Sequence, residues 1–442
     1  MRLTEHRYRT VTAVRGPLLF LERVFAARLG ELVTIVAPDG RRLDGEILKI
    51  DGGNVVVQVF GDTQGLDTDR TEVRLADVVR RAPLGIDCLG RLFDGSFRPR
   101  DGLPMYIPTR WQPVTGAPIN PVARAHPEEF IETGISAIDA LNTLVKGQKL
   151  PIFTCAGLPA RELTEQLLRQ ARLPDAGPFV LVFVALGLTH YEYHHYARTL
   201  EQLPGRHVAF VNLADEPVIE RLLAPRLGLT VAEHLAFEHG MDVLVIIADM
   251  ANYCDALREV ATAREELPGR RGYPGHMYSD LASLYERAGR LRGRPGSVTM
   301  LPVVTMPEDD ITHPIPDLTG YITEGQIVLS RQLHQLGIFP PIDVLPSLSR
   351  LMNQGIGERH TRADHRDLAG RLYRAYAKGR ELRRLEAVVG REGLLEEDRH
   401  MLDFAERFER GFIHQGGERR TVAESLDLGA RLLADSERGA AC

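Results

Sequence analysis

The sequence predicts a multidomain chain: an N-terminal β-barrel, a central α/β domain with a doubly wound parallel sheet, and a C-terminal α-helical bundle. Short β-type runs broken by glycine turns occupy about residues 8–74. Continuous Val/Ile/Leu runs then alternate with helical segments between about 133 and 305. Beyond Arg350 only helical spacing remains. With 442 residues, the chain is long enough for about three domains of roughly 150 residues each, which we place at 1–75, 76–345 and 346–442.

Composition excludes several classes of protein. Apolar residues make up 44% and charged residues 26%, which is typical of a globular chain and not of a disordered or fibrous one. The 54 Lys and Arg against 60 Asp and Glu leave a net charge of −6, so a dominant nucleic-acid surface is not expected. The longest apolar run, about 179–188, is half of what a bilayer crossing needs. We therefore expect a cytoplasmic chain that reaches a membrane only through partners.

Cysteine usage favours a reducing compartment. The four cysteines lie far apart and form no C-x-x-C pair, which excludes a disulfide framework and a zinc knuckle of the usual spacing. They are Cys88, Cys155, Cys254 and Cys442.

The barrel region alternates strands and turns at close spacing. Runs 32–36, 46–50 and 55–60 are separated by Pro-Asp-Gly and Asp-Gly-Gly-Asn turns, as in a small antiparallel barrel. The passage 94–127 that follows is rich in proline and glycine, so we expect a long ordered connector without regular elements.

The central region predicts buried parallel strands, and the C-terminal region predicts amphipathic helices. Helical spacing places Met401, Ala405, Phe408 and Phe412 on one face. The expected strands are 149–153, 179–185, 207–212, 241–249 and 297–305.

A degenerate phosphate loop follows the first of these strands. A working P-loop needs glycines, a lysine for the β- and γ-phosphates and a Ser/Thr hydroxyl for magnesium. In register with Gly157, Leu158 takes the lysine position and Pro159 the hydroxyl position. The alternative is an ordinary strand-to-helix turn with proline in the first helical turn, beside which Arg161 is a possible substitute cation. The segment comprises Thr154, Cys155, Ala156, Gly157, Leu158, Pro159 and Arg161.

Asp249 ends the apolar strand 241–249. An aspartate at this position is typical of the magnesium-water ligand of P-loop enzymes. It is equally typical of a cap on the helix that follows. The sequence leaves both interpretations open.

Three longer motifs resemble the B (regulatory) subunit of V-type and archaeal-type ATP synthases and ATPases. They are DDITHPIPDLTGYITEGQ at 309–326, EELPGRRGYPG at 265–275 and LPSLSRL at 345–351, and the degenerate loop at Gly157 belongs with them. The likeness extends from the N-terminal barrel to about Leu432. It implies a barrel, a RecA-like nucleotide-binding fold and a helical bundle, in agreement with the segments above.

The resemblance also implies an assembly. Three B subunits alternate with three catalytic A subunits around a central stalk, peripheral stalk subunits attach to the ring, and ATP/ADP with Mg is bound at A–B interfaces. Membrane contact comes only through the ion-translocating sector. A catalytic subunit would carry a glutamate base after the next strand, where this chain reads Ala-Leu-Gly-Leu-Thr at 185–189. We therefore expect the chain itself to be non-catalytic, with nucleotide binding at its own site in doubt.

Arg350 matches the position of the family's arginine finger, which points at the γ-phosphate in the neighbouring A subunit. A guanidinium keeps its charge and forms forked hydrogen bonds to phosphoryl oxygens, which is worth roughly 10³–10⁵ in rate. Without the resemblance, a loop arginine of this kind would more readily pair with a surface carboxylate.

Two features depart from the family. Ala156 stands where B subunits usually keep a glycine. His190 and His194, four residues apart, share a helix face as metal ligands do, but spacing supplies no third ligand, so no metal site is predicted.

The sequence thus predicts a non-catalytic regulatory subunit that couples ATP synthesis or hydrolysis to proton or sodium transport. Two alternatives remain. One is a hexameric RecA-like nucleic-acid motor, which would need an intact P-loop and a basic channel. The other is a purely structural assembly protein, which differs from the first interpretation only through Arg350.

Overall fold

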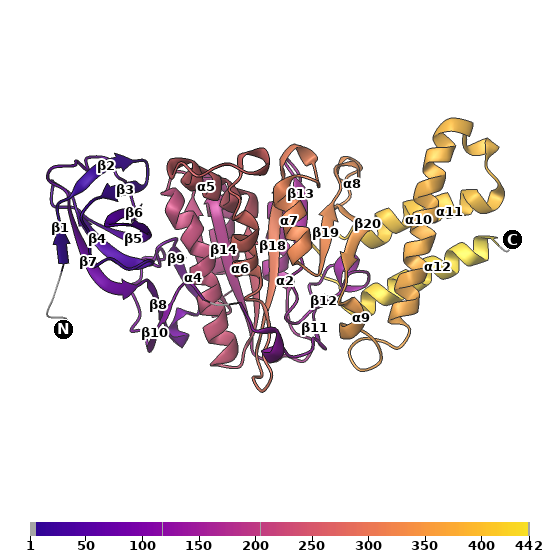
Figure 1. The fold of residues 1–442 in the computed structure, drawn as a ribbon. Coiled ribbons are helices and arrows are strands. Elements are labelled where there is room, and N and C mark those ends of the chain that lie inside the picture. The colour runs from indigo at the N-terminus through magenta and orange to yellow at the C-terminus, as the bar shows by residue number, and fades with distance from the viewer. Residues whose placement is uncertain (1–5, 117, 204, 441–442) are drawn as a thin grey trace.

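The computed structural model describes residues 6–116, 118–203 and 205–440, with the side chains of 76–79 and 438–440 left out. A strand-rich N-terminal part, a central sheet flanked by helices and a helical C-terminal part lie in a row, with the sheet in the middle (Figure 1). The three-part architecture predicted from the sequence is confirmed. Cys442 lies outside the described residues.

The N-terminal part is one seven-stranded antiparallel sheet in the order β1-β7-β4-β5-β6-β3-β2. Alternate residues of β4 point into an apolar core, where Val33 and Ile35 meet Ile47 and Val57. Its strands are β1 (His6–Tyr8), β2 (Val11–Arg15), β3 (Leu18–Leu21), β4 (Glu31–Val36), β5 (Arg42–Asp51), β6 (Asn54–Phe60) and β7 (Glu72–Val79).

The connector 94–127 is more regular than its composition predicted. β10 (Arg110–Pro113) pairs antiparallel with β8 (Arg81–Leu84), and a 3₁₀ turn covers Pro121–Ala123. Proline is tolerated in such a strand because a two-stranded ribbon consists of edges, where a missing N–H breaks no interior ladder. The expectation of a passage without regular elements is therefore wrong at these residues.

The central sheet runs in the order β20-β19-β13-β18-β16-β14-β15-β9, with the short β17 (Gly289–Arg290) paired to β18. The ladders from β19 to β9 are parallel, whereas β20 and β17 are antiparallel to their neighbours. All five strands expected from apolar runs are found. The strands are β9 (Arg91–Asp94), β13 (Ile152–Cys155), β14 (Phe179–Leu188), β15 (His207–Leu213), β16 (Asp242–Ala248), β18 (Ser297–Met306), β19 (Gly325–Leu329) and β20 (Ile342–Ser349). A two-stranded pair, β11 (Phe130–Ile131) with β12 (Leu144–Val145), lies apart from it.

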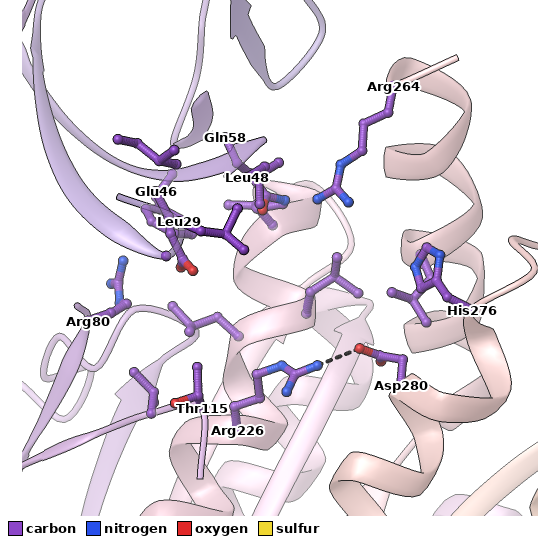
Figure 2. A pocket seen from close by; sticks show the side chains of 18 of the residues that line it. Leu29, Glu46, Leu48, Gln58, Arg80, Thr115, Arg226, Arg264, His276 and Asp280 are labelled. Atoms are coloured by element: carbon purple, nitrogen blue, oxygen red, sulfur yellow. Dashed lines mark hydrogen bonds and ion pairs between the residues drawn. The ribbon is translucent and has the colours of Figure 1, made fainter. Parts of the chain in front are cut away.

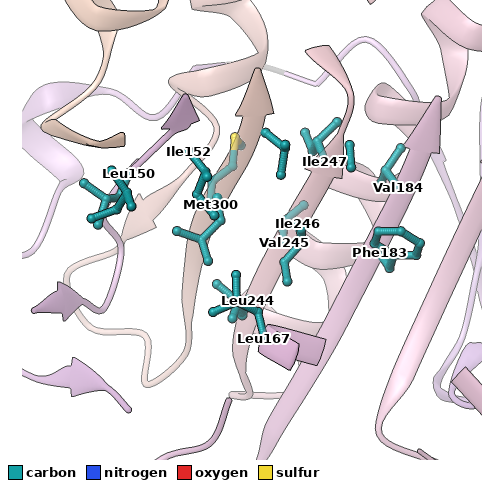
Figure 3. Close-up of a cluster of buried hydrophobic side chains, with 14 of the residues drawn as sticks. Leu150, Ile152, Leu167, Phe183, Val184, Leu244, Val245, Ile246, Ile247 and Met300 are labelled. Atoms are coloured by element: carbon teal, nitrogen blue, oxygen red, sulfur yellow. The ribbon is translucent and has the colours of Figure 1, made fainter. Parts of the chain in front are cut away.

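The core of the molecule lies on this sheet. Phe183, Val245 and Met300, on neighbouring strands, are fully buried in one hydrophobic cluster, which also contains Leu167 of a covering helix (Figure 3). Burial of both faces explains why the strands read as unbroken apolar runs. The helices of this part are α1 (Ser136–Asp139), α2 (Ala160–Gln170), α3 (His190–Glu201), α4 (Val218–Phe237), α5 (Met250–Ala263), α6 (Met277–Tyr285), α7 (Pro314–Ile322) and α8 (Arg331–Gln335).

The C-terminal part is helical, as expected. Ala405, Phe408 and Phe412 are fully buried, and Met401 is partly buried. The rings of Phe408 and Phe412 stack, with their centres 4.8 Å apart. The chain is π-helical at 408–413. The helices are α9 (Met352–Gly355), α10 (His365–Val389), α11 (Glu396–Arg407) and α12 (Val422–Ala440). No helix among the described residues is long and apolar enough to cross a membrane.

Candidate functional site

The degenerate phosphate loop borders a cavity of about 500 Å³ at the carboxyl ends of the central strands. The turn between β13 and α2, the end of β14 and the start of α5 all line this cavity. Ligands of open α/β sheets bind at this edge because strand ends and helix N-termini converge there. The cavity is therefore where a nucleotide would bind if this chain held one by itself.

The loop has the position of a P-loop without its chemistry. Gly157 adopts a positive φ of 80°, and the Leu158 N–H donates to the Cys155 carbonyl at 3.1 Å. The Leu158 side chain is buried, where a P-loop lysine would reach toward phosphate. The sequence placed Pro159 in the first turn of the helix. In the structure it is instead the N-cap residue of α2, one position before the helix begins. It offers neither a hydroxyl nor an N–H to a bound group.

Cys155 and Thr154 contribute nothing that would bind phosphate. Thr154 is buried, and its hydroxyl lies 3.5 Å from the Cys155 carbonyl. Burial, with a smaller effect of the Asp309 carboxylate, raises the pKa of the Cys155 thiol to about 11. The thiol is therefore protonated at neutral pH.

The cations beside the loop are already bound to carboxylates. Arg161 donates to Glu165 at 3.0 Å and to Glu162 at 2.6 Å. The sequence suggested Arg161 as a substitute cation, but its charge is neutralised by these two glutamates of the same helix. A second cation that sequence reasoning missed, Arg331 of α8, donates to Asp309 at 2.8 Å.

Arg331 also fixes the loop itself. Its guanidinium donates to the carbonyl of Ala156 at 3.0 Å. Hydrogen bonding from Arg331 in turn holds the pKa of Asp309 below its usual value. No signal in the sequence could have found this contact, because the two residues are 175 positions apart.

Asp249 is held by backbone donors. Its Oδ1 accepts from the N–H of Ala251 at 2.8 Å, and its carboxylate accepts from the N–H of Thr305 at 3.1 Å. Burial raises its pKa, against these hydrogen bonds. The structure therefore gives Asp249 the capping contact that the sequence left as one of two interpretations.

A carboxylate absent from the sequence argument also lines the cavity. Glu192 forms a capping box, in which its Oε2 accepts from the N–H of Thr189 at 2.9 Å and from the Thr189 hydroxyl at 2.8 Å. The T-x-x-E pattern at 189–192 was the signal that would have found it. Engaged in this way, Glu192 is not free to act as a base.

The charge around the cavity disfavours a polyphosphate. The Arg, Lys, Asp and Glu side chains of its lining are one arginine, Arg161, and four carboxylates: Glu192, Asp249, Asp255 and Glu308. A triphosphate would face these carboxylates without the lysine that a working P-loop supplies. The residues present do not fit Mg-nucleotide bound by this chain alone.

Arg350 lies elsewhere, at the far side of the sheet. It directly follows β20, the antiparallel edge strand, and lines a separate cavity of about 330 Å³ with Gln326 and Tyr373. Its backbone N–H donates to the Glu324 carbonyl at 3.0 Å. The side chain is exposed, and no carboxylate of the described residues pairs with it.

Two serines fix the segment that carries Arg350. The Ser347 hydroxyl accepts from the Val328 N–H at 3.0 Å and donates to the Asp343 carbonyl at 2.6 Å. The buried Ser349 hydroxyl donates to the Thr143 carbonyl at 3.0 Å. A fixed strand end thus presents the long arginine side chain, with its guanidinium, to solvent.

The structure also joins two of the motifs. Arg270 donates to Asp317 and Arg271 donates to Asp310, both at 2.9 Å, so residues of 265–275 bind residues of 309–326. Gly325 has a φ of 139°, and a Cβ there would lie 2.0 Å from the carbonyl oxygen of Leu348. Only glycine therefore fits at this point of the β19–β20 pairing.

The histidine segment forms the exposed start of α3. The His190 side chain contacts a single carboxylate: its Nε2 lies 3.2 Å from an oxygen of Asp215. Within the described part of the chain, no group of three or more His, Cys, Asp or Glu side chains could hold a metal ion.

Three family models cover most of the chain. The nucleotide-binding domain of the ATP synthase alpha/beta family matches residues 134–349, its beta-barrel domain matches 11–75, and the C-terminal domain of V and A type ATP synthase matches 354–441. These matches agree with the barrel, the α/β sheet and the helical part described above.

Individual relatives agree with the models. The chain is 70% identical to the V-type ATP synthase beta chain of Geotalea uraniireducens over 433 residues, which is 98% of each chain. It is 51% identical to the V-type ATP synthase beta chain of Thermus thermophilus over 449 aligned positions, covering 99% of this chain and 94% of the relative. The solved structure of the ATP synthase subunit NeqB from Nanoarcheaum equitans superposes with a TM-score of 0.76 at 37% identity, over 95% of this chain and 99% of that one.

Identity at this level over almost the full length of both chains shows that the chain belongs to the ATP synthase alpha/beta family, among the V-type ATP synthase beta (B) chains.

Proposed function

We propose that the chain is the non-catalytic, regulatory subunit of a V/A-type rotary ATP synthase or ATPase, and that it contributes Arg350 to a catalytic site on a neighbouring A subunit. The observation that carries the proposal is a contrast: the one arginine that lines the cavity, Arg161, is ion-paired, whereas Arg350, on a fixed strand end, is exposed and has no carboxylate partner among the described residues. The chain would assemble with A subunits into an A3B3 ring that binds the stalk subunits. It would meet the membrane only through the ion-translocating sector.

The chemistry assigned to Arg350 is electrostatic. ATP or ADP with Mg would be bound at the A–B interface by the A subunit's own phosphate loop. The γ-phosphoryl group gains negative charge on its equatorial oxygens during transfer, and a guanidinium can donate two hydrogen bonds to them at once. Because Arg350 has no carboxylate partner among the described residues, it need not break an ion pair in order to bind phosphate.

The chain's own cavity supports the non-catalytic half of the proposal. Hydrolysis needs phosphate binding, a magnesium ligand and a base, and Leu158, Pro159 and the capped Glu192 supply none of these. Purified alone, the chain should show no Mg-ATP turnover. Turnover that disappears on Asp249→Ala would contradict the proposal.

The decisive experiment uses the assembled complex. Arg350→Ala should reduce ATP turnover about a hundredfold or more. Assembly, followed by size-exclusion chromatography, should be unchanged because the side chain is exposed and unpaired. The matched control is Arg359→Ala, which removes another exposed arginine nine positions further along and should leave the rate unchanged.

The same experiment separates the proposal from a purely structural role. A structural subunit would assemble equally well with either substitution, and both complexes would turn over at the wild-type rate. Calorimetric titration of ADP into the complex and into the isolated chain locates the nucleotide, with binding expected only in the complex.

A further inference from the structure

The Arg350 side chain is not held in place by a partner of its own. In the cavity of about 480 Å³ between the barrel and the central domain, by contrast, Arg226 of α4 donates to Asp280 of α6 at 2.5 Å (Figure 2). Arg350 is exposed, and among the described residues no carboxylate pairs with it. Where its guanidinium lies therefore depends on the backbone segment from which the side chain extends.

That segment contains a bulge in the edge strand β20. Along β20 the paired residues jump from Asp343 to Leu348, whereas the partner strand β19 advances by only two residues. Residues 344–347 therefore leave the regular pairing and form a bulge. A bulge changes the direction of the strand and of the side chains next to it, and Arg350 follows shortly after the pairing resumes.

Two carbonyl groups of the bulge accept hydrogen bonds from side chains of other elements. The Gln326 amide of β19 donates to the carbonyl of Pro346 at 3.0 Å. The Tyr373 hydroxyl of α10 donates to the carbonyl of Leu345 at 3.0 Å. Gln326 and Tyr373 also line the cavity of about 330 Å³ that Arg350 borders. The bulge is therefore held both by the sheet and by the C-terminal helical part.

Helix α10 meets β20 at a second point. The guanidinium of Arg380 lies 3.8 Å from the carboxylate of Asp343, the residue at which the bulge begins. Arg380 comes about two turns after Tyr373, so both side chains lie on one face of α10. The Arg380 guanidinium is itself fixed, because it donates to the Tyr376 hydroxyl at 3.0 Å. The segment that carries Arg350 is thus attached to α10.

The Tyr373 hydrogen bond fixes a position more than it stabilises the fold. The Tyr373 side chain is 41% exposed, and a hydrogen bond at the surface contributes little net free energy because water competes for both groups. Without the hydroxyl, water can still bind the Leu345 carbonyl, but the bulge is no longer tied to α10. A reacting group displaced by about 1 Å can reduce a rate about a hundredfold.

We propose that Tyr373 is a positioning residue for Arg350. Its hydroxyl holds the bulge at 344–347, and with it the Arg350 guanidinium, where the guanidinium reaches the γ-phosphate of a nucleotide on the neighbouring A subunit. This role rests on the proposed function, because Tyr373 touches no nucleotide and acts only through Arg350. Since Tyr373 belongs to α10, the position of Arg350 depends on the C-terminal helical part.

The first test is Tyr373→Phe in the assembled complex, which removes the hydroxyl and keeps the ring. We expect kcat for ATP hydrolysis to fall about tenfold, with KM changed less than about twofold, because the A subunit binds the ground-state nucleotide. The matched control Tyr278→Phe removes an exposed hydroxyl that has no hydrogen-bond partner among the described residues, and kcat should stay unchanged. Both substitutions should shift the midpoint of thermal unfolding of the full chain by less than about 2 °C.

The second test separates positioning from a structural role. If Tyr373 acts only through Arg350, Tyr373→Phe should not lower turnover further in a complex that already carries Arg350→Ala. A structural contact would lower turnover by the same factor in both backgrounds. Wild-type kcat for Tyr373→Phe, a change in KM alone, or equal losses in both backgrounds would each overturn the role of Tyr373.

The same set of complexes distinguishes failure of this role from failure of the proposed function. If Arg350→Ala leaves turnover unchanged, the proposed function is wrong, and the role of Tyr373 is wrong with it. If Arg350→Ala slows turnover about a hundredfold while Tyr373→Phe has no effect, Arg350 keeps its function and only the positioning by Tyr373 is rejected.

Discussion

Two regions of the central domain, the phosphate loop after β13 and the end of β20, hold the arginines that bear on the proposed function, and the two regions differ in how those arginines are paired. Beside the phosphate loop, Arg161 and Arg331 are bound to carboxylates of the same chain. At the end of β20, Arg350 is exposed and bound to none of the described carboxylates. A charge that is already paired cannot stabilise a substrate without losing its partner, whereas an unpaired charge on a fixed strand end can. The comparison teaches that the arginines beside the chain's own phosphate loop are neutralised, whereas Arg350 keeps the free guanidinium that the proposed function requires.

The largest expected effect tests the forked geometry of Arg350. Arg350→Lys keeps the charge but replaces the planar fork by a point charge. We expect turnover of the complex to stay at least about tenfold below the wild type, although above that of Arg350→Ala. Steady-state ATP hydrolysis measures this, and a wild-type rate with lysine would reduce the role of Arg350 to charge alone.

The next effect tests whether the loop lacks only its side chains. Leu158→Lys combined with Pro159→Thr restores a cation and a hydroxyl at the P-loop positions. We expect this double variant, unlike the wild-type chain, to bind Mg-ADP measurably when isolated, with an affinity at least about tenfold above the detection limit. It should not hydrolyse ATP, because Glu192 remains in its capping box. The control pair Leu158→Met and Pro159→Ala changes the same positions without polar groups and should leave affinity as it is. If both double variants have the same affinity for Mg-ADP, the surrounding carboxylates, and not the missing lysine and hydroxyl, prevent nucleotide binding.

Substitution of Asp249 should lower the free energy of unfolding of the chain and leave the turnover of the complex nearly unchanged. Asp249→Ala removes the acceptor of the Ala251 and Thr305 N–H groups, which should cost about 1–2 kcal/mol in the free energy of unfolding. Denaturant unfolding measures it, and Asp249→Asn should recover part of the loss because its amide oxygen can still cap. Turnover of the assembled complex should change less than about threefold. A large loss of turnover with normal stability would return Asp249 to the magnesium role.

The smallest effect concerns Cys155. With a pKa of about 11, the thiolate fraction at pH 8 is about one in a thousand and rises about tenfold for each pH unit. Iodoacetamide should therefore modify Cys155 about a hundredfold more slowly than in the denatured chain, as read by peptide mass spectrometry. Modification at the denatured-chain rate would mean that the loop is open and that the contact of Arg331 with Ala156 does not hold it.

The sequence predicted the elements whose signal is local. Apolar runs located β14, β16 and β18 because both faces of those strands are buried. The connector strand Arg110–Pro113 was missed because its stability comes from pairing with Arg81–Leu84 and not from its own residues. The edge strands β9 and β20 were missed for a similar reason: Arg91–Asp94 is short and half polar, and Ile342–Ser349 contains a proline tolerated only at an edge.

The sequence by itself determined that the phosphate loop lacks its lysine and hydroxyl, and its LPSLSRL motif led us to expect Arg350 at the arginine-finger position of the family. Both follow from residue identity, which needs no coordinates. Only the tertiary structure decided which charges are free. Ion pairs such as Arg331 with Asp309 and Arg270 with Asp317 join residues that are separated in the chain. The energy of a charge depends on its distance from other charges and on its exposure to water, and folding sets both.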